Sequence, residues 1–218
     1  MTTCDFENRR RWARRKEART GELLTAALDL FVERGYAATR LDDVAAQAGV
    51  SKGTLYLYFT SKEELFKAVV RHTVFPVLGE AMETIELYEG SSATLFQKIV
   101  LDWWERIGNT RLSGLTKLTI AEAGNFPEVA KFYHEEVICR CADVITSVLV
   151  RGVTCGEFRS INTGNVVSIV VAQIMMMTIW KHSFCICGVE PISPESYLTC
   201  FTDLLLIGLL NKASALLL

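Results

Sequence analysis

Between residues 39 and 62 the chain concentrates side chains whose chemistry suits contact with a nucleic acid. The set combines hydroxyl groups, cations and one glycine: Thr39, Arg40, Ser51, Lys52, Gly53, Thr54, Tyr56, Tyr58 and Lys62. Cations and hydroxyl groups bind phosphate oxygens, and a short side chain such as that of Thr54 can reach a base edge or a thymine methyl group. Gly53 would let the backbone approach a partner closely. Lys62 opens a predicted helix, where a cation opposes the helix dipole unless an anion such as a phosphate lies nearby.

Short amphipathic helices must position these side chains. An apolar stripe over residues 23–31 predicts a first helix that ends at Gly35. Thr39, as an N-cap, predicts a second helix of about two turns that Gly49 closes, and the free amides at its start could hold a phosphate. Ser51 predicts the cap of a third short helix. Two short helices joined by a tight turn are the unit that presents a recognition helix to the major groove.

The segment from Thr39 to Leu65, TRLDDVAAQAGVSKGTLYLYFTSKEEL, carries this pattern without interruption. It closely resembles the DNA-binding signature of the tetracycline-repressor (TetR) family, which runs AGVSxGTLYxYFxSKExL. The resemblance implies a three-helix helix-turn-helix domain over residues 1–62, joined to a larger helical ligand-sensing and dimerisation domain over residues 63–218. Arg40 stands where the family often has Ser or Thr, so a contact of Arg40 with a phosphate or the minor groove has weaker support.

The charge distribution favours the same end of the chain for contact with DNA. Residues 1–62 contain 11 Lys and Arg against 8 Asp and Glu, whereas residues 63–218 contain 12 against 17. A basic cluster over Arg9–Lys16 predicts an N-terminal arm that could reach the minor groove. The net charge of the whole chain, -2, hides this asymmetry.

The rest of the chain also follows the helical period, and no stretch alternates as a strand would. Ser61 with Glu64 predicts a capping box at the start of a fourth helix, which should bend near Pro76. Turn-forming residues then separate five further helices, at roughly 92–108, 111–123, 127–151, 163–184 and 194–212. The sequence therefore predicts an all-α fold of about nine helices in total.

The helical body could enclose a small, largely apolar effector. Aromatic and sulfur-containing side chains suited to the wall of an apolar cavity are Phe96, Trp103, Trp104, Tyr133, His134, Met176 and Trp180. The alternative for each of them is a place in the ordinary core. The resemblance implies a repressor that a bound ligand releases from DNA, and activation stays open.

The last two helices, over residues 164–181 and 195–210, are apolar on more than one face, which predicts that a second subunit covers them. In the TetR family the corresponding helices pair in a four-helix bundle, so the resemblance implies a homodimer on a palindromic operator. The apolar stretch 166–180 is too short and too polar for a membrane span, which predicts a buried helix and no membrane partner. A polar, charged N-terminus without an apolar leader predicts a cytoplasmic protein.

An enzyme, a redox sensor and a DNA-binding module without operator preference are the alternative functions. We expect no enzyme, cofactor or metal site, because the three histidines are far apart in the sequence and no nucleophile or ligand motif surrounds them. A redox-responsive regulator of the same fold could use its thiols instead of a ligand. The thiols that suit this alternative are Cys185 and Cys187 with Cys155 or Cys200.

Overall fold

The computed structural model describes residues 3–185 and 193–211, with side chains from Glu17 onward. The basic arm expected over Arg9–Lys16 therefore lies outside the described side chains, and so does Cys187. Over the described residues the prediction of an all-α fold is confirmed. Extended pairing there is limited to an isolated antiparallel bridge between Phe158 and Leu210.

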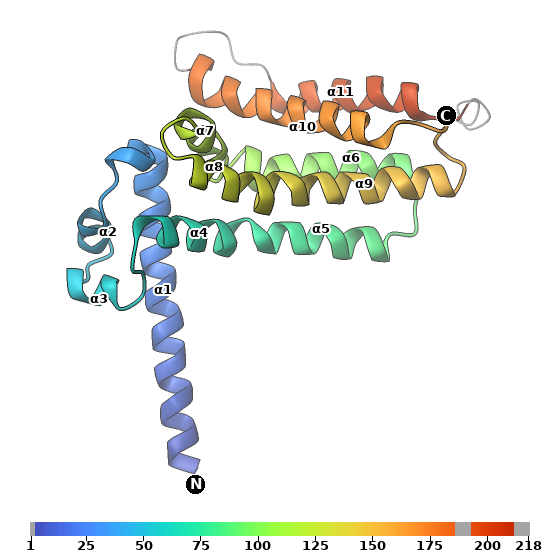
Figure 1. Ribbon diagram of the computed structural model, residues 1–218. Helices are drawn as coiled ribbons and strands as arrows, with labels where there is room; N and C mark the ends of the chain where they lie inside the picture. The colour runs from blue at the N-terminus through green and yellow to red at the C-terminus, as the bar shows by residue number, and fades with distance from the viewer. Residues whose placement is uncertain (1–2, 186–192, 212–218) are drawn as a thin grey trace. The chain divides into compact units, whose positions relative to one another are not determined.

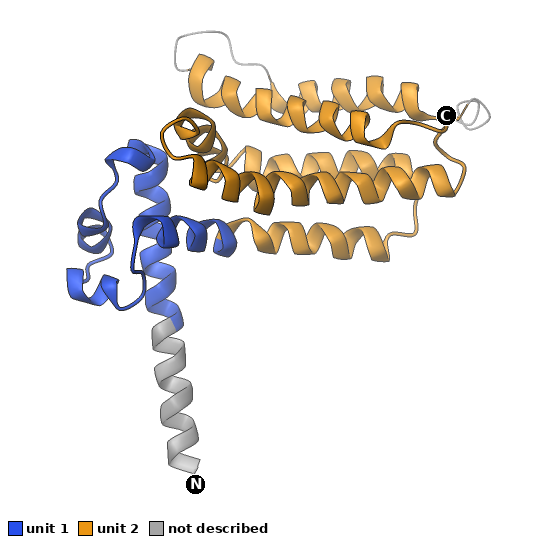
Figure 2. Cartoon of the chain, in the orientation of Figure 1, with its two compact units in different colours: residues 1–72 blue, residues 73–218 orange. Residues whose placement is uncertain are grey.

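Two compact units make up the chain, residues 1–72 and residues 73–218 (Figure 2). The sequence places the domain boundary after residue 62, at the start of the fourth helix. In the structure this helix belongs to the first unit. The first unit holds α1 (Thr3–Ala38), α2 (Leu41–Gln47), α3 (Lys52–Tyr56) and α4 (Lys62–Thr73), which ends one residue into the second unit.

An aromatic cluster forms the centre of the first unit. The rings of Phe31 and Tyr36 stack with centroids 5.7 Å apart, and the ring of Phe66 meets them edge-on at 5.5 and 5.7 Å. All three side chains are buried, as are Leu55 of α3 and Val44 of α2. Burial of each such side chain contributes roughly 1.5–3 kcal/mol, so these contacts fix the short helices α2 and α3 against α1 and α4.

Local signals in the sequence end and begin these helices largely as predicted. Gly35 interrupts α1 with φ 84°, and Gly49 turns the chain between α2 and α3 with φ 66°, a left-handed conformation that favours glycine. The hydroxyl oxygen of Ser61 accepts a hydrogen bond from the amide of Glu64 (3.1 Å). The carboxylate of Glu64 accepts from both the amide and the hydroxyl of Thr60, each at 2.7 Å. One bond of the predicted capping box is therefore formed between Ser61 and Glu64, and the reciprocal bond joins Glu64 to Thr60 instead of Ser61.

The second unit is a layered helical body (Figure 1). Its helices are α5 (Phe75–Leu87), α6 (Ser92–Trp103), α7 (Ser113–Glu122), α8 (Pro127–Tyr133), α9 (Cys139–Thr154), α10 (Thr163–Ile179) and α11 (Pro194–Leu209). The π-helical segments η1 (Trp104–Gly108), η2 (His134–Ile138) and η3 (Trp180–Phe184) extend α6, join α8 to α9 and extend α10. Helices α6 and α9 form a middle layer between α5 and the pair α10 and α11. Pro76 lies in the first turn of α5, which confirms the break expected there.

Helix α10 corrects the expectation of a buried helix. The continuous helix over Thr163–Phe184 is longer than the apolar stretch that the sequence marks, and by length and composition it could cross a membrane. Only 22% of its apolar window is buried within this chain. Its apolar side chains are therefore only partly covered in the single chain: Ile169 and Met176 are exposed, as are Leu204 and Ile207 of α11.

Candidate nucleic-acid interface and ligand cavity

Helices α2 and α3 form a helix-turn-helix that buries one face of α3 and exposes the other. Leu55 points into the core and is fully buried. The hydroxyl oxygen of Ser51 caps α3 by accepting from the amide of Thr54 (3.1 Å), and the two hydroxyl groups lie 2.8 Å apart. This cap confirms the predicted start of the third helix and holds the side chain of Thr54 at the exposed end of the first turn.

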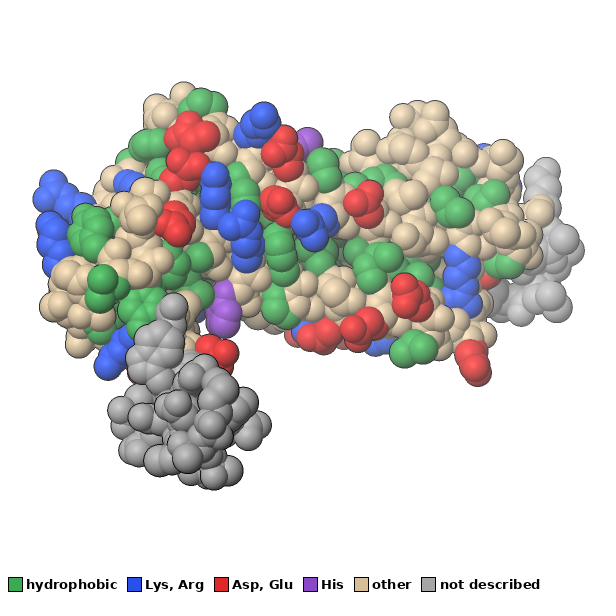
Figure 3. All heavy atoms as spheres, turned by 60° about the horizontal axis from the view of Figure 1, so that its bottom comes forward, with side chains coloured by type: hydrophobic (Ala, Val, Ile, Leu, Met, Phe, Trp, Pro, Cys, Tyr) green, Lys and Arg blue, Asp and Glu red, His purple; other side chains and the backbone are tan. Residues whose placement is uncertain are grey.

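The exposed face of α3 presents a cation, a glycine and aromatic groups to solvent. Lys52, Gly53 and Tyr56 are exposed, and Tyr58 is half-buried beside Phe59. A Cβ atom added at Gly53 would meet only the hydroxyl of Ser51, at 3.8 Å, so no packing inside the chain requires glycine there. In Figure 3, Lys and Arg side chains gather at the left, over the segment that holds α2 and α3.

An exposed ion pair joins the two helices. The ammonium group of Lys52 donates to the Asp42 carboxylate of α2 at 2.8 Å, and this hydrogen bond raises the pKa of Lys52. Both side chains are more than half exposed, so water and salt screen the pair strongly. A phosphate could therefore compete with Asp42 for the ammonium group. Arg40 is exposed at the N-cap of α2 and faces no such competitor among the described ion pairs.

Thr39 has a different local role from the predicted one. Arg40, not Thr39, is the N-cap of α2. Thr39 is only 1% exposed, and its hydroxyl donates to the carbonyl oxygens of Gly35 (2.7 Å) and Leu30 (3.2 Å). It thus satisfies backbone acceptors where α1 is interrupted, and the prediction that it caps α2 is wrong.

Lys62 also has a partner inside the chain. Its ammonium group donates to the carbonyl oxygens of Tyr36 (2.7 Å) and Ala37 (3.1 Å) and lies 4.5 Å from the centroid of the Tyr36 ring. The carbonyl end of a helix carries partial negative charge, which attracts a cation. The end of α1 therefore explains a lysine in the first turn of α4 without a phosphate.

The sequence reasoning missed Leu57, the residue that follows α3. Its side chain is 85% exposed, between Tyr56 and Tyr58. A leucine this exposed on the helix-turn-helix surface is suited to apolar contact with thymine methyl groups or deoxyribose. The sequence contained a sign of this exposure. Leu57 stands at a variable position of the family signature, and Leu55 already provides the buried apolar side chain of α3.

A cavity of about 230 Å³ lies inside the second unit, lined by residues from α5 to α10. Trp103 and Tyr133 of the predicted ligand-binding set line it. Trp104, Met176 and Trp180 instead line a separate pocket of about 340 Å³ beside Tyr197 of α11. Two other members of the set lie elsewhere: Phe96 is fully buried and His134 is exposed, and the cavity linings described for residues 3–185 and 193–211 do not include them.

Polar groups in the wall of the cavity bond mainly to one another. The hydroxyl groups of Tyr133 and Thr116 lie 2.7 Å apart. Burial raises the pKa of Tyr133 and raises that of the Cys141 thiol to about 12, so both groups stay protonated near neutral pH. The wall is otherwise dominated by branched aliphatic side chains such as Ile99 and Val144.

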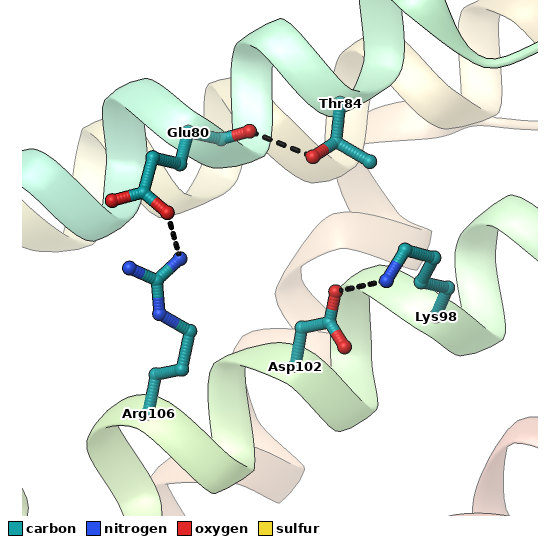
Figure 4. A network of polar contacts seen from close by, with 5 residues as sticks. All are labelled: Glu80, Thr84, Lys98, Asp102 and Arg106. Atoms are coloured by element: carbon teal, nitrogen blue, oxygen red, sulfur yellow. Dashed lines mark hydrogen bonds and ion pairs between the residues drawn. The ribbon is translucent and has the colours of Figure 1, made fainter.

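Charged side chains occur at one side of the cavity, where α5 faces α6 and η1 (Figure 4). Arg106 donates to the Glu80 carboxylate at 2.8 Å, and this bond lowers the pKa of Glu80. One turn earlier, within α6, the ammonium group of Lys98 donates to the carboxylate of Asp102 at 2.7 Å. The hydroxyl of Thr84 donates to the backbone oxygen of Glu80 (2.8 Å). The sequence analysis identified none of these residues, because partners on different helices leave no local pattern.

The described cysteines with free thiols, outside any disulfide, are Cys139, Cys141, Cys155, Cys185 and Cys200. Cys139 lies 3.8 Å from Nδ1 of His134, on the exposed side of η2. The redox alternative depends partly on Cys187, which lies outside the described residues.

Comparison with known proteins identifies a matching family model and sequence relatives, among them a repressor and an activator. The family model described as bacterial regulatory proteins, tetR family, matches residues 23–69. The transcriptional repressor KstR2 of Rhodococcus jostii is 32% identical over 146 residues, which cover 66% of this chain and 70% of that protein. The transcriptional activator FasR of Mycolicibacterium smegmatis is 49% identical over 59 residues, only 27% of either chain.

A solved structure extends the likeness to the whole fold. A transcriptional regulator from Saccharomonospora viridis, crystallised in complex with choline, superposes with a TM-score of 0.74 at 19% identity. The superposition covers 90% of this chain and 100% of that one. The chain therefore shares the fold of that regulator.

Proposed function

The chain belongs to the TetR family of bacterial regulatory proteins, and from this membership we propose that it is a transcriptional repressor. It would bind a palindromic operator as a homodimer and would leave the operator when a small ligand fills the cavity of the second unit. The exposed face of α3 is the observation that carries the proposal. KstR2, which is matched over 70% of its length, is named as a repressor, whereas FasR, named as an activator, is matched over 27% of its length.

The contacts with DNA follow from the exposure of each side chain. Lys52 and Arg40 would bind phosphates, and Gly53 would admit the DNA backbone close to α3. Thr54 and Leu57 would contact base edges and thymine methyl groups in the major groove. Lys62 would act mainly by fixing α1 against α4, because its ammonium group is already bonded to Tyr36 and Ala37.

The dimer would form through α10 and α11. Tyr197 of α11 donates to the side chain of Gln173 on α10 at 2.6 Å, so the two helices are neighbours. Large apolar side chains are exposed on both: Ile169, Met176, Leu204 and Ile207. A second copy related by a two-fold axis would bury these side chains against their own equivalents and would provide two recognition helices for two half-sites.

Release from DNA would follow from differential affinity. A ligand that binds more tightly to a conformation with the wrong spacing of half-sites shifts the dimer towards it, with a coupling of about 1–3 kcal/mol. The cavity of about 230 Å³ lined by Trp103 and Tyr133 is the proposed effector site.

Selection of bound fragments from a random DNA library at near-physiological salt tests the proposal. We expect an enriched palindrome, weaker binding of the Lys52→Ala variant, and unchanged binding of Lys98→Ala, which alters a comparably exposed ion pair in the second unit. Transcription in vitro from a promoter that overlaps the palindrome should fall when the protein is added. Absence of any enriched sequence, with the protein folded and dimeric, would overturn operator binding.

Charge substitution tests the proposed dimer face. Leu204→Glu should yield monomers in sedimentation velocity and lose tight operator binding, because Leu204 is 67% exposed on α11. Leu87→Glu is the matched control, since Leu87 is 82% exposed at the end of α5. A dimeric Leu204→Glu protein with full operator affinity would contradict the assignment of this face.

A further inference from the structure

The cavity of the second unit has a charged side and an apolar interior. Arg106 and Glu80 have side chains 40% and 57% exposed, so their ion pair stands at the solvent edge of the cavity. Deeper lining residues are nearly inaccessible, such as Val100, Val137 and Val144. A ligand with one charged end and an apolar body would keep its charge near water and bury only its body, which avoids the cost of burying an ion.

Arg106 has more donors than its ion pair uses. The contact with Glu80 engages Nη1, and Figure 4 shows the guanidinium group between α5 and η1 with its other nitrogens directed elsewhere. A guanidinium group carries five N–H donors, and its planar edge fits a carboxylate through two parallel hydrogen bonds. A second carboxylate could therefore bind Arg106 without displacing Glu80.

The carboxylates at the cavity edge are already neutralised by cations. Glu80 is paired with Arg106 and Asp102 with Lys98, at 2.8 and 2.7 Å. A cationic ligand would share these carboxylates with their intramolecular partners. An anionic ligand would use the N–H donors of Arg106 that Glu80 leaves open, and the two ion pairs leave no net negative charge at this edge to repel it.

The size of the cavity limits the body of the ligand. An engineered apolar cavity of about 150 Å³ holds benzene, so about 230 Å³ suits a molecule about half as large again. The hydroxyl pair of Tyr133 and Thr116 satisfies itself at 2.7 Å and requires no polar group from the ligand. The interior is thus suited to a short aliphatic or a single-ring body.

We propose that the effector of this protein is a small carboxylic acid, bound as its carboxylate with the headgroup on Arg106 and the apolar body among the aliphatic side chains of α6, α9 and α10. The inference rests on the proposed function for the role of the site as an effector site. Its chemistry rests on the cavity alone.

Calorimetric titration of the purified full-length protein with octanoate, 1-octanol and octylammonium tests the charge of the headgroup. These probes share one aliphatic body and differ in charge. We expect octanoate to bind at least about tenfold more tightly than either of the others, which is the effect of one charge-assisted hydrogen bond. Equal binding of 1-octanol, tighter binding of octylammonium, or no octanoate binding by the folded protein would each overturn the proposal.

Variants then test the role of Arg106. Arg106→Gln should abolish the preference for octanoate over 1-octanol, and so should the double variant Arg106→Gln with Glu80→Gln, which removes any repulsion from an unpaired carboxylate. Lys98→Gln with Asp102→Asn is the matched control, because it removes the neighbouring ion pair as a unit and leaves no unpaired carboxylate, and it should keep the preference. Retained preference in both Arg106 variants would exclude Arg106 as the headgroup site.

The outcome is separable from that of the proposed function. Operator selection needs no ligand and titration needs no DNA. An enriched palindrome together with failed octanoate binding would overturn only the ligand assignment, whereas octanoate binding without an operator would overturn only the regulatory role.

Discussion

Replacement of Lys62 by methionine separates two explanations of a lysine at the start of α4. In the structure the ammonium group bonds to the carbonyl oxygens of Tyr36 and Ala37 and lies over the Tyr36 ring. Hydrogen bonds to a charged group contribute about 1.5–3 kcal/mol, but Lys62 is only half-buried and water can replace part of the interaction. We therefore expect Lys62→Met to lower the free energy of unfolding by about 1–2 kcal/mol.

Thermal and urea denaturation measure this loss. For a chain of this length, 1 kcal/mol corresponds to about 2–4 °C in Tm, so the expected shift is about 2–8 °C. Lys52→Met is the control within the same unit, because its pair with Asp42 is exposed and is screened by water and salt, so its loss should change Tm little.

The salt dependence of operator binding provides the second readout. A lysine that neutralises one phosphate contributes about 0.9 to the slope of log affinity against log salt concentration. We expect Lys62→Met to change stability and to leave this slope nearly unchanged, whereas Lys52→Met should reduce the slope. An unchanged Tm for Lys62→Met together with a reduced slope would refute the structural role and restore the phosphate interpretation.

Three further substitutions test separate features. The hydrogen bonds from Thr60 lower the pKa of Glu64 from its ordinary value of 4.5. Their stabilisation is therefore present above pH 4.5 and is lost as the pH falls through the folded-state pKa. The urea midpoint of Glu64→Gln should accordingly depend less on acid pH than that of the unaltered protein. Gly53→Ala should leave Tm unchanged or slightly higher and should weaken operator binding in a mobility-shift assay, because only DNA would meet the added methyl group. Gly108→Ala should lower stability by about 1–3 kcal/mol in urea denaturation, because the added Cβ would overlap the ring of Trp104.

Each of these three has a contradicting result. An acid dependence that survives in Glu64→Gln would assign it to other carboxylates. Full operator affinity in Gly53→Ala would mean that the DNA backbone does not approach this residue. An unchanged urea midpoint in Gly108→Ala would mean that the Trp104 ring moves away at no cost, unlike the packing seen here.

Short-range signals in the sequence were sufficient for the DNA-binding segment. Glycine at positive φ, serine caps and a three-residue spacing between Ser61 and Glu64 act within a few residues, so Gly49 and Ser51 could be read directly from the chain. Helical periodicity likewise predicted the all-α fold and the limits of α10 with η3, because each residue's face depends only on its position along one helix.

Partners distant in the sequence could not be read in this way. Lys62 bonds to carbonyl groups 25 and 26 residues earlier, and Thr39 turns back to α1 instead of capping α2. Periodicity shows that Trp103 and Trp104 are on a helix, but not that one lines the cavity and the other a separate pocket.

The sequence by itself therefore determined the all-α fold and most of the helix ends, because these depend on local backbone geometry and on amphipathic spacing. The tertiary structure alone decided which side chains share the cavity, which cation sits at its edge and how far α10 stays uncovered. These properties depend on which helix faces which, and the packing of whole helices sets that arrangement.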